Sequence, residues 1–331
     1  MSSSEPFVSV VTPVYNGEPY LAECIESVLA QCYANWEYII LDNCSTDRTN
    51  EIAQRYAKMD RRIVVYRNDK LIDVISNHNS AYQKISPHSR YCKLLHADDW
   101  MFPFCLREMV NLAEQHPSIG IVSAYSLVGK RVRNIGLPYP STVSSGRSIA
   151  RQTLLGQYYL FWSPSSLMIR SDLVRANDPF YNPELLHADV DSLYVLLQNC
   201  DFGFVHQVLT FIREHEASLT STLTKHMNRL ILSNLHLLAV HGPKYLTPSE
   251  FSDYYRERVK AYYRFLARNA LELREPGFWQ YHKEWLSKFG FSFERTKLLK
   301  AIIGMLVYRP QRSVATVFYA VRDRIKNEFA F

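Results

Sequence analysis

Phe7–Gly17 reads FVSVVTPVYNG, and this stretch decides how the chain begins to fold. The β-branched run from Phe7 to Thr12 predicts a buried strand, which Pro13 and the polar residues after it end in a loop. Residues 18–31 place apolar side chains on one helical face and acidic residues near the start, a pattern that predicts a helix. A strand that leads through a polar loop into a helix is the repeating unit of an α/β fold.

The same unit recurs further along the chain. The runs Trp36–Leu41, Ile63–Tyr66 and Tyr91–Leu95 predict further strands, and another helix is expected to begin near Thr46. Strands that alternate with crossover helices predict a Rossmann-like fold, with a mostly parallel central sheet flanked by helices.

Three polar loops follow the carboxyl ends of these predicted strands, at residues 13–17, 42–47 and 96–100. Ligands of open parallel sheets bind outside the carboxyl ends of the strands. We therefore expect the three loops to line one crevice.

Composition divides the chain into two parts. Hydrophobic residues make up 47% of the chain and charged residues 21%, as in ordinary globular proteins. Residues 226–331 hold 18 Lys and Arg against 9 Asp and Glu, a net +9, whereas residues 1–225 carry −3. Beyond about residue 225 the strand pattern stops and Leu-, Tyr- and Arg-rich segments begin. The sequence thus predicts an α/β domain over residues 1–225 and a basic helical region over 226–331.

The C-terminal region raises the question of partners. Its most apolar stretch, residues 298–308, is shorter than the roughly 20 residues of a membrane span, and Lys297, Lys300 and Arg309 lie at its edges. It is expected either to lie on an anionic membrane surface or to pack on the α/β domain. Because the first part is acidic and no RNA-binding motif is present, we expect no nucleic acid partner.

The six cysteines form no CxxC pair, so neither a zinc pattern nor a disulfide framework is indicated. The N-terminus has no basic segment ahead of its short apolar run, which a signal peptide would need. We therefore expect a cytoplasmic protein, with peripheral contact at the inner face of the cell membrane as the further expectation for the C-terminal region.

The stretch Lys93–Phe102, KLLHADDWMF, sets Asp98 and Asp99 side by side directly after a predicted strand. Two adjacent carboxylates repel each other unless a cation lies beside them. Mg²⁺ and Mn²⁺ take carboxylate ligands together with the oxygens of a substrate diphosphate, so the pair predicts a divalent metal and a nucleotide ligand. The alternative is that the pair caps the helix that follows.

Other loop residues suit a nucleotide. Asp42 can accept a hydrogen bond from the imide N–H of uracil, and the ring of Tyr15 can stack on a base. No GxGxxG or GxxxxGK[ST] motif is present, so glycine-rich phosphate cradles are not indicated and phosphate neutralisation is expected to come from the metal.

Taken in order, VSVVTPVYNGEPYLAECIESVLAQ, YIILDNCSTDRT and LLHADDW resemble the family 2 glycosyltransferases, which have the GT-A fold. The resemblance covers roughly residues 7–220. It implies a nucleotide-sugar donor, a divalent metal and transfer with inversion at the anomeric carbon. It also divides the expected catalytic domain into a nucleotide-sugar part, about 7–100, and an acceptor and base part, about 101–225.

The resemblance assigns roles to single residues. Those expected to bind the nucleotide-sugar are Pro13, Tyr15, Asn16, Glu18, Asp42 and Asp98, the last as a ribose contact. Asp99 is the expected metal ligand, because the family motif usually reads Asp-x-Asp-Asp and His96 stands here in its first position. The FIREHEASLTS segment resembles an Arg-x-His-x-x-Ser motif, which implies Arg213 as a diphosphate contact and His215 as a metal ligand.

Inverting transfer needs a general base for the acceptor hydroxyl. The family's Glu-Asp motif maps onto Ala188-Asp189, so Asp189 takes the base position although Ala188 replaces the glutamate. Asp191 is interpreted as a charge that complements the dipole at the start of a helix.

Aromatic residues offer an acceptor site, with packing as the alternative. Trp100 is expected to form the active-site wall or a plug under its loop, and Tyr158, Tyr159, Phe161 and Trp162 stack on sugars or pack in the core.

The sequence predicts an inverting glycosyltransferase that uses Mn²⁺ or Mg²⁺. It would move a sugar, most simply from a UDP-sugar, to a hydroxyl of a glycan or lipid-linked saccharide in surface polysaccharide biosynthesis. The alternative is a non-catalytic module that binds a nucleotide or sugar, because His96 and Ala188 depart from the motifs. A nucleotidyltransferase is disfavoured, since PVYNGEPY has no Lys or Arg.

Overall fold

A computed structural model describes residues 5–185, 187–215, 229–272 and 274–308. The chain forms two compact units, residues 1–214 and 215–331. The predicted boundary near residue 225 falls among residues 216–228, which lie outside the described ranges.

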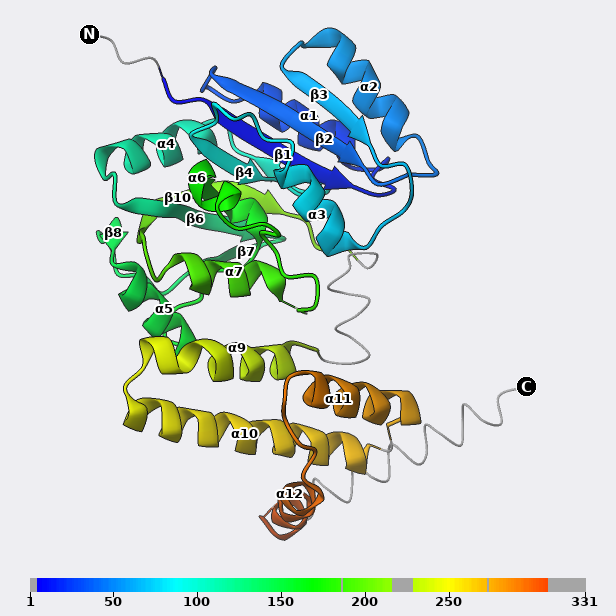
Figure 1. Cartoon of the computed structure of the whole chain (residues 1–331), viewed down its shortest axis with the longest axis vertical. Helices are drawn as coiled ribbons and strands as arrows, with labels where there is room; N and C mark the ends of the chain where they lie inside the picture. The colour runs from blue at the N-terminus through cyan, green and yellow to red at the C-terminus, as the bar shows by residue number, and fades with distance from the viewer. Residues whose placement is uncertain (1–4, 186, 216–228, 273, 309–331) are drawn as a thin grey trace. The chain divides into compact units, whose positions relative to one another are not determined.

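The first unit is built around one sheet (Figure 1). In the part of the chain that the structure describes, its strands are β1 Val8–Val14, β2 Trp36–Asp42, β3 Ile63–Arg67, β4 Tyr91–Leu94, β5 Trp100–Met101, β6 Ile119–Val128, β7 Arg131–Arg133, β8 Val143–Ser144, β9 Leu167–Arg170 and β10 Asp201–Ile212. The order across the sheet is β3-β2-β1-β4-β9-β6-β10-β5, and β7 and β8 pair with β6 and β10.

The direction of the strands confirms the predicted α/β fold. Strands β1 to β4 are mutually parallel, and β6 is parallel to β10. Strand β9 runs antiparallel to both β4 and β6, so these two share one direction. The sheet is therefore mostly parallel at its centre, and the carboxyl ends of β1, β2 and β4 meet at one edge.

Each predicted strand exists, most boundaries agree within one residue, and the largest difference is at the end of β1. Strand β1 continues past Pro13 to Val14, with Pro13 paired to Leu41 and buried. The Val11 carbonyl accepts from Leu95 on the β4 side, so Pro13, two residues later, also faces that side. Pairing of β4 with β1 ends at Val11. The missing N–H of Pro13 therefore removes no ladder hydrogen bond, and the expectation that the strand ends at Thr12 is wrong for this reason.

Helices cover both faces of this sheet. They are α1 Leu21–Leu29, α2 Thr49–Met59, α3 Val74–Tyr82, α4 Cys105–Gln115, α5 Gly146–Leu154, α6 Ser171–Arg175 and α7 Ala188–Leu196, with a 3₁₀ turn at Pro164–Ser166. Residues of α1, α2 and α4 share one buried cluster with β1 and β2, whereas α3 contacts β1 and β2 without joining it. Figure 1 shows α3 in front of the strands and α1 behind them.

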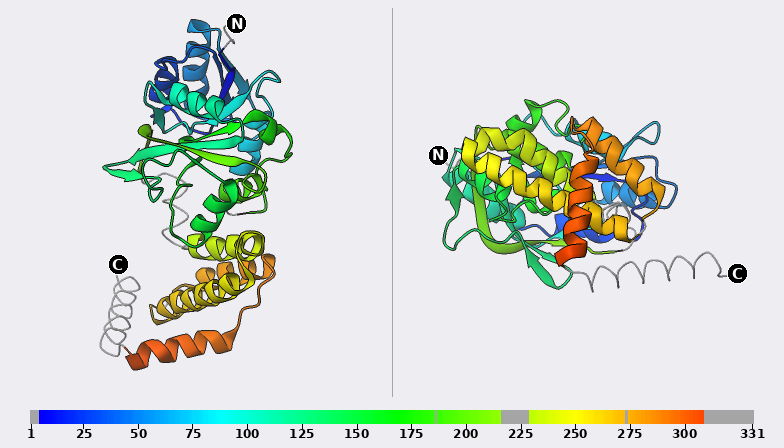
Figure 2. Two further views of the ribbon diagram at one scale, coloured as in Figure 1. Left: turned by 90° about the vertical axis from the view of Figure 1, so that its left-hand side faces the viewer. Right: turned by 90° about the horizontal axis from the view of Figure 1, so that it is seen from below.

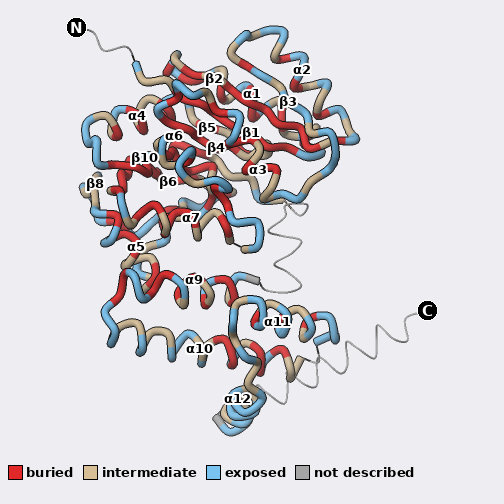
Figure 3. Tube along the Cα trace, in the orientation of Figure 1, coloured by how far each residue is buried: buried red, intermediate tan, exposed pale blue. Residues whose placement is uncertain are grey.

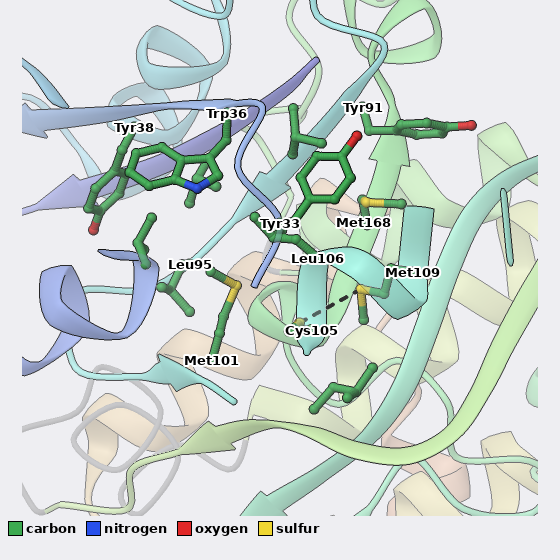
Figure 4. Close-up of a cluster of buried hydrophobic side chains, with 14 of the residues drawn as sticks. Tyr33, Trp36, Tyr38, Tyr91, Leu95, Met101, Cys105, Leu106, Met109 and Met168 are labelled. Atoms are coloured by element: carbon green, nitrogen blue, oxygen red, sulfur yellow. Dashed lines mark hydrogen bonds between the residues drawn. The ribbon is translucent and has the colours of Figure 1, made fainter. Parts of the chain in front are cut away.

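Alternation along the strands explains this cluster. On β2, the alternate residues Trp36, Tyr38 and Ile40 face it, as period-two geometry requires. Figure 4 shows Trp36 and Tyr38 next to each other in this cluster, and the sulfur of Cys105 beside that of Met109. The central strands are buried along nearly their whole length (Figure 3), so they fix the loops at their ends.

The second unit is helical in its described residues, as predicted. Its helices are α9 Arg229–Tyr245, α10 Pro248–Leu271, α11 Pro276–Lys288 and α12 Arg295–Tyr308 (Figure 2). Thr247 and Glu250 form a capping box that starts α10. A separate core includes Tyr262 and Phe278, and the Tyr262 hydroxyl lies 3.0 Å from Nδ1 of the buried His282.

No helix within the described ranges is long and apolar enough to cross a membrane. Helix α12, which contains the apolar stretch 298–308, leaves Leu299, Ile303 and Val307 exposed. Either expectation for this stretch therefore stays a prediction.

Candidate active site

The loops after β1 and β2 are joined by a set of hydrogen bonds at the carboxyl edge of the sheet. The Asn16 amide donates to Ser45 Oγ at 2.9 Å, and Asn16 Oδ1 accepts from the Thr46 amide at 2.9 Å. The Gly17 amide donates to Thr49 Oγ1 at 2.7 Å. Asn16 has φ 50°, a left-handed conformation that asparagine tolerates better than most residues. The predicted nucleotide residue Asn16 is thus also a structural link between two loops.

The loop after β4 lies against the first loop. A Cβ placed on Gly17 would lie 3.5 Å from the Cβ of Ala97 and 2.5 Å from a methyl group of Val14. The distance to Val14 is too short for a real Cβ, whereas the distance to Ala97 is ordinary van der Waals contact, so the two loops lie close together at Gly17. The three polar loops therefore meet, as the sequence predicts.

Asp42 ends β2 and is completely buried. Its Oδ1 accepts a hydrogen bond from the Ser45 amide at 3.0 Å. Its Oδ2 accepts none from any described residue and lies 3.4 Å from Nε of Arg67. This buried oxygen is therefore ion-paired with Arg67 and still has an open hydrogen-bond acceptor position.

The other predicted nucleotide residues differ in their surroundings. The Tyr15 side chain is 49% exposed, so its ring is available for stacking. Glu18 pairs with Arg48 at 2.7 Å and accepts from the Arg48 amide at 3.0 Å. Hydrogen bonds from Arg48, backbone first and side chain next, hold the pKa of Glu18 below its usual range. Pro13 lies buried within β1, whereas Tyr15 and Asn16 are exposed.

An acidic cluster follows β4. Among the described residues, His96, Asp98 and Asp99 form the group whose ligand atoms all lie within 4.8 Å of one another. Asp99 is almost completely buried at 2% exposure, and His96 and Asp98 are partly exposed. Two carboxylates beside a partly exposed surface suit a hard divalent cation whose remaining coordination positions are filled by diphosphate oxygens. The residues present therefore fit Mn²⁺ or Mg²⁺.

Asp99 is oriented by donors from distant parts of the chain. Its Oδ2 accepts from Ser165 Oγ at 2.6 Å, and its Oδ1 accepts from the Arg213 amide at 3.0 Å. His96 Nδ1 lies 3.6 Å from Oδ2. Burial lowers the pKa of His96, but the hydrogen bond and charge of Asp99, with help from Asp98 and Asp189, raise it above its ordinary value.

Arg213 lies beside the acidic cluster, as its motif predicts. Its Nε donates to the Asp98 carbonyl at 3.1 Å, and its guanidinium pairs with Glu23. The guanidinium carbon lies 4.6 Å from the Tyr20 ring centroid and 5.1 Å from that of Trp100. These contacts hold a cation at the edge of the site, where phosphate oxygens are expected.

Asp189 and Asp191 lie in the first turn of α7, a position that was predicted for Asp191. The charge of Asp189 raises the pKa of both His96 and Tyr181 in addition to other causes. Its carboxylate is therefore close enough to the acidic cluster to interact with it electrostatically. Ala188 is buried at the start of the helix.

Trp100 packs face to face on Phe211, with ring centroids 3.7 Å apart. This stacking between β5 and β10 agrees with the alternative that Trp100 plugs the space under its loop. The Arg213 guanidinium also lies over the Trp100 ring, so Trp100 borders the candidate site. In the aromatic group after α5, Tyr159 and Trp162 are 63% and 50% exposed, whereas Phe161 packs against Tyr194 and Phe202. That group thus divides between surface and core.

His215 is the first residue of the second unit. Its predicted role as a metal ligand stays a prediction, and the residues after it, 216–228, lie outside the described part of the chain.

Two residues of the site escaped the sequence analysis. Lys93 is fully buried within β4, and its Nζ donates to the carbonyls of Ser165 at 2.7 Å and Leu167 at 3.3 Å. A lysine inside the apolar run YCKLL was a readable signal, because lysine is almost never fully buried without partners. Ser165 carried no such signal, since its contact with Asp99 spans 66 residues.

Fold and site together define the class: an α/β protein with a candidate cation and nucleotide site at the carboxyl ends of its parallel strands. Residues 9–176 match the family described as Glycosyl transferase family 2, which is half of the chain. The chain belongs to the family 2 glycosyltransferases, and the resemblance found in the sequence is confirmed.

Relatives support the family and differ in length. TuaG of Bacillus subtilis (strain 168), named for teichuronic acid biosynthesis, is 41% identical over 131 residues, 39% of this chain and 51% of that protein. EpsE of the same organism, named as a glycosyltransferase, is 33% identical over 162 residues, 46% of this chain and 57% of that protein. The chain thus matches little more than half the length of these relatives.

Two solved structures share the fold. TarS 1–349 of S. aureus in complex with UDP-GlcNAc has a TM-score of 0.64 at 16% identity, covering 96% of this chain and 89% of that one. The mannosyltransferase PcManGT from Pyrobaculum calidifontis, in complex with GDP-Man and Mn²⁺, has a TM-score of 0.54 at 16% identity, covering 99% and 88%. The GT-A type of fold expected from the sequence agrees with these likenesses.

Proposed function

We propose that this protein is an inverting, metal-dependent glycosyltransferase that moves a sugar from a UDP-sugar to a hydroxyl of a glycan or lipid-linked saccharide. The observation that carries the proposal is the cluster of His96, Asp98 and Asp99 after β4. It supports a cation position at the carboxyl edge of the sheet, and the electrostatic effect of Asp189 on His96 supports Asp189 as the candidate base. Surface polysaccharide biosynthesis is the proposed setting, supported by the name of TuaG.

UDP is favoured as the nucleotide for two reasons. The open Oδ2 of Asp42 suits the imide N–H of uracil, and the exposed ring of Tyr15 suits stacking. The TarS structures that share the fold were solved with UDP and UDP-GlcNAc.

A divalent cation held by Asp99 and Asp98 would neutralise the charge that develops on the departing diphosphate. Arg213 adds a second cation at the same edge. Asp189 takes the proton of the acceptor hydroxyl as that oxygen attacks the anomeric carbon and the bond to the diphosphate breaks. His215 is proposed as a further ligand by its motif position alone.

The test is release of nucleoside diphosphate from a panel of UDP-, GDP- and dTDP-sugars with Mn²⁺ or Mg²⁺ and with chelator. Wild type is expected to release UDP only with metal. Asp189→Asn is expected to lower the rate by about 10²–10⁴-fold, the usual contribution of a general base. Asp191→Asn, two residues further along the same helix, is the control that should change the rate little. Retained anomeric configuration in the product, or full activity of Asp189→Asn, would contradict the proposal.

The second candidate function is a non-catalytic module that binds a nucleotide or sugar. His96 and Ala188 favour it, since both stand where the family usually has an acidic residue. UDP binding without turnover of any donor, across a panel of glycan acceptors, would support this candidate instead.

We also propose a cytoplasmic location with peripheral contact at the inner membrane face through the second unit. The exposed Leu299, Ile303 and Val307 of α12, with Lys297 and Lys300 on the same helix, support it. Co-sedimentation with anionic vesicles, compared with neutral ones, tests this proposal; equal recovery without vesicles would contradict it.

A further inference from the structure

We infer that Ser165, anchored by the buried cation Lys93, is a positioning residue that fixes Asp99 in the orientation needed to bind a divalent cation. The inference rests on the proposed metal dependence and adds a role for two residues outside the family motifs. It is carried by hydrogen bonds among buried and part-buried groups.

The Ser165 hydroxyl connects the two ends of the acidic loop. It donates to Asp99 Oδ2 at 2.6 Å and accepts from the His96 amide at 3.0 Å. A hydroxyl has one proton and two lone pairs, so the amide of His96 directs the Ser165 proton toward Asp99. With Oδ1 fixed by the Arg213 amide, the Asp99 carboxylate is held at both oxygens.

Ser165 itself is fixed from beneath. Its carbonyl accepts from Lys93 Nζ at 2.7 Å and from Thr210 Oγ1 at 3.3 Å, and its amide donates to Ser163 Oγ at 3.2 Å. Both Ser165 and Lys93 are 0% exposed. Any rotation of the Ser165 backbone would therefore break buried hydrogen bonds, which costs more than breaking exposed ones.

Lys93 also offsets the charge of the acidic pair. Burial lowers the pKa of Lys93, and attraction to Asp99 is among the effects that oppose this shift. A buried ammonium is expensive unless hydrogen bonds and a nearby carboxylate compensate it. The attraction between Lys93 and Asp99 therefore offsets part of the repulsion between Asp98 and Asp99 before any metal ion binds.

The neighbouring Ser166 shows that the contact of Ser165 is specific. Ser166 is equally buried, at 1% exposure, and lies in the same 3₁₀ turn. Its hydroxyl donates to the Ser163 carbonyl at 2.7 Å, a purely local bond. Ser165 reaches across 66 residues to Asp99 instead. The two serines therefore form a matched pair, one at the site and one structural.

The experiment measures Mn²⁺ binding to the full chain by isothermal titration, with excess UDP present, for wild type and for S165A, S165C and S166A. Loss of a side chain that orients a metal ligand usually weakens metal binding about 10- to 100-fold. We expect S165A to raise the Mn²⁺ dissociation constant by about tenfold or more on that basis. S166A should change it less than about twofold, because its bond is local.

The variant S165C keeps nearly the volume of serine with a weaker donor, so it remains usable if S165A does not fold. It should bind Mn²⁺ with an affinity between those of wild type and S165A. Thermal unfolding of each variant without metal measures its loss of stability separately from its loss of Mn²⁺ binding.

The outcomes separate the inference from the proposed function. Wild type that binds Mn²⁺, together with S165A that binds it equally well, would overturn the inference alone. Wild type that releases UDP from a UDP-sugar without binding Mn²⁺ would overturn metal dependence and, with it, the role given to Ser165. Equal weakening in S165A and S166A would reduce Ser165 to a structural residue.

Discussion

The candidate site has two halves that are held in different ways. The cation half comprises His96, Asp98 and Asp99 with their donors, and the nucleoside half comprises the loops after β1 and β2 with Asp42. Asp99 accepts hydrogen bonds at both oxygens, from residues 66 and 114 positions away. Asp42 accepts at one oxygen, from a residue three positions away, and its other oxygen accepts from no described residue.

The difference indicates a division of labour. A carboxylate fixed by distant buried donors is preorganised, and preorganised charge acts on the transition state. A buried acceptor left open gains its partner when a ligand supplies one, which acts on binding. We therefore expect changes in the cation half to lower kcat and changes in the nucleoside half to raise KM.

Of the substitutions that test this division, Asp99→Asn should have the largest effect, a fall in kcat. It removes the charge that holds the cation while its two donors remain, and the loss of one preorganised electrostatic group typically lowers kcat by about 10²–10³-fold. UDP release with Mn²⁺ measures it. Asp253→Asn, an exposed aspartate on α10, is the control that should leave the rate unchanged. A kcat within twofold of wild type, with a raised KM, would show that the halves are not divided in this way.

Asp42→Asn should act on KM. The change keeps the acceptor for the Ser45 amide but removes the charge of the open oxygen, and a hydrogen bond to a charged group contributes about 1.5–3 kcal/mol, or roughly 10- to 150-fold. KM for the UDP-sugar and the dissociation constant of UDP should rise together. Asp69, an exposed aspartate just after β3, gives the control Asp69→Asn. A fall in kcat with unchanged UDP affinity would place Asp42 in the cation half.

Tyr15→Ala should raise KM for the UDP-sugar by less than Asp42→Asn does. The partly exposed ring is expected to stack on the base, and aromatic stacking contributes about 0.5–1.5 kcal/mol beyond buried area, or roughly 2- to 12-fold. Tyr15→Phe keeps the ring and should stay near the wild-type value. If the phenylalanine variant is as impaired as the alanine variant, the hydroxyl rather than the ring makes the contact.

Asp47→Ala tests how the nucleoside half is held together, and should have the smallest effect. Asp47 accepts from the Glu18 amide at 3.1 Å and the Thr49 amide at 3.0 Å. Its loss should lower the free energy of unfolding by about 1.5–3 kcal/mol, the net value of a hydrogen bond to a charged group. Thermal unfolding at neutral pH measures the loss, and kcat should not change.

The same residue gives a pH dependence. Burial would raise the pKa of Asp47, but hydrogen bonds from Thr49 and the Glu18 amide lower it below its ordinary value of 3.8. A carboxyl with a depressed pKa stabilises the folded state above the unfolded pKa and loses that effect as the pH falls through the folded pKa. The gap in unfolding temperature between wild type and Asp47→Ala should therefore be constant near neutral pH and narrow below 3.8. A gap that widens in acid would contradict the assignment.

Much of the fold was predictable because its signals are local. Apolar runs such as Trp36–Leu41 and the helical pattern after Pro13 depend on a few neighbouring residues, and those neighbours stay together in the structure. The strand end at Pro13 was misjudged because the cost of a missing N–H depends on the strand beside it, which no local pattern reveals. The acidic cluster was predictable for the same reason as the strands, since His96, Asp98 and Asp99 share one loop.

By itself, then, the sequence determined the first four strands with the helices between them, the helical character of the second unit, the family, and the three loops that carry polar side chains. Only the tertiary structure decided what surrounds them. Strand β9 enters the sheet between β4 and β6, and this brings Ser165 and Lys93 together beneath Asp99. The physical reason is that strand pairing acts between residues far apart in the chain, so the charge balance and orientation of Asp99 follow from the assembled sheet.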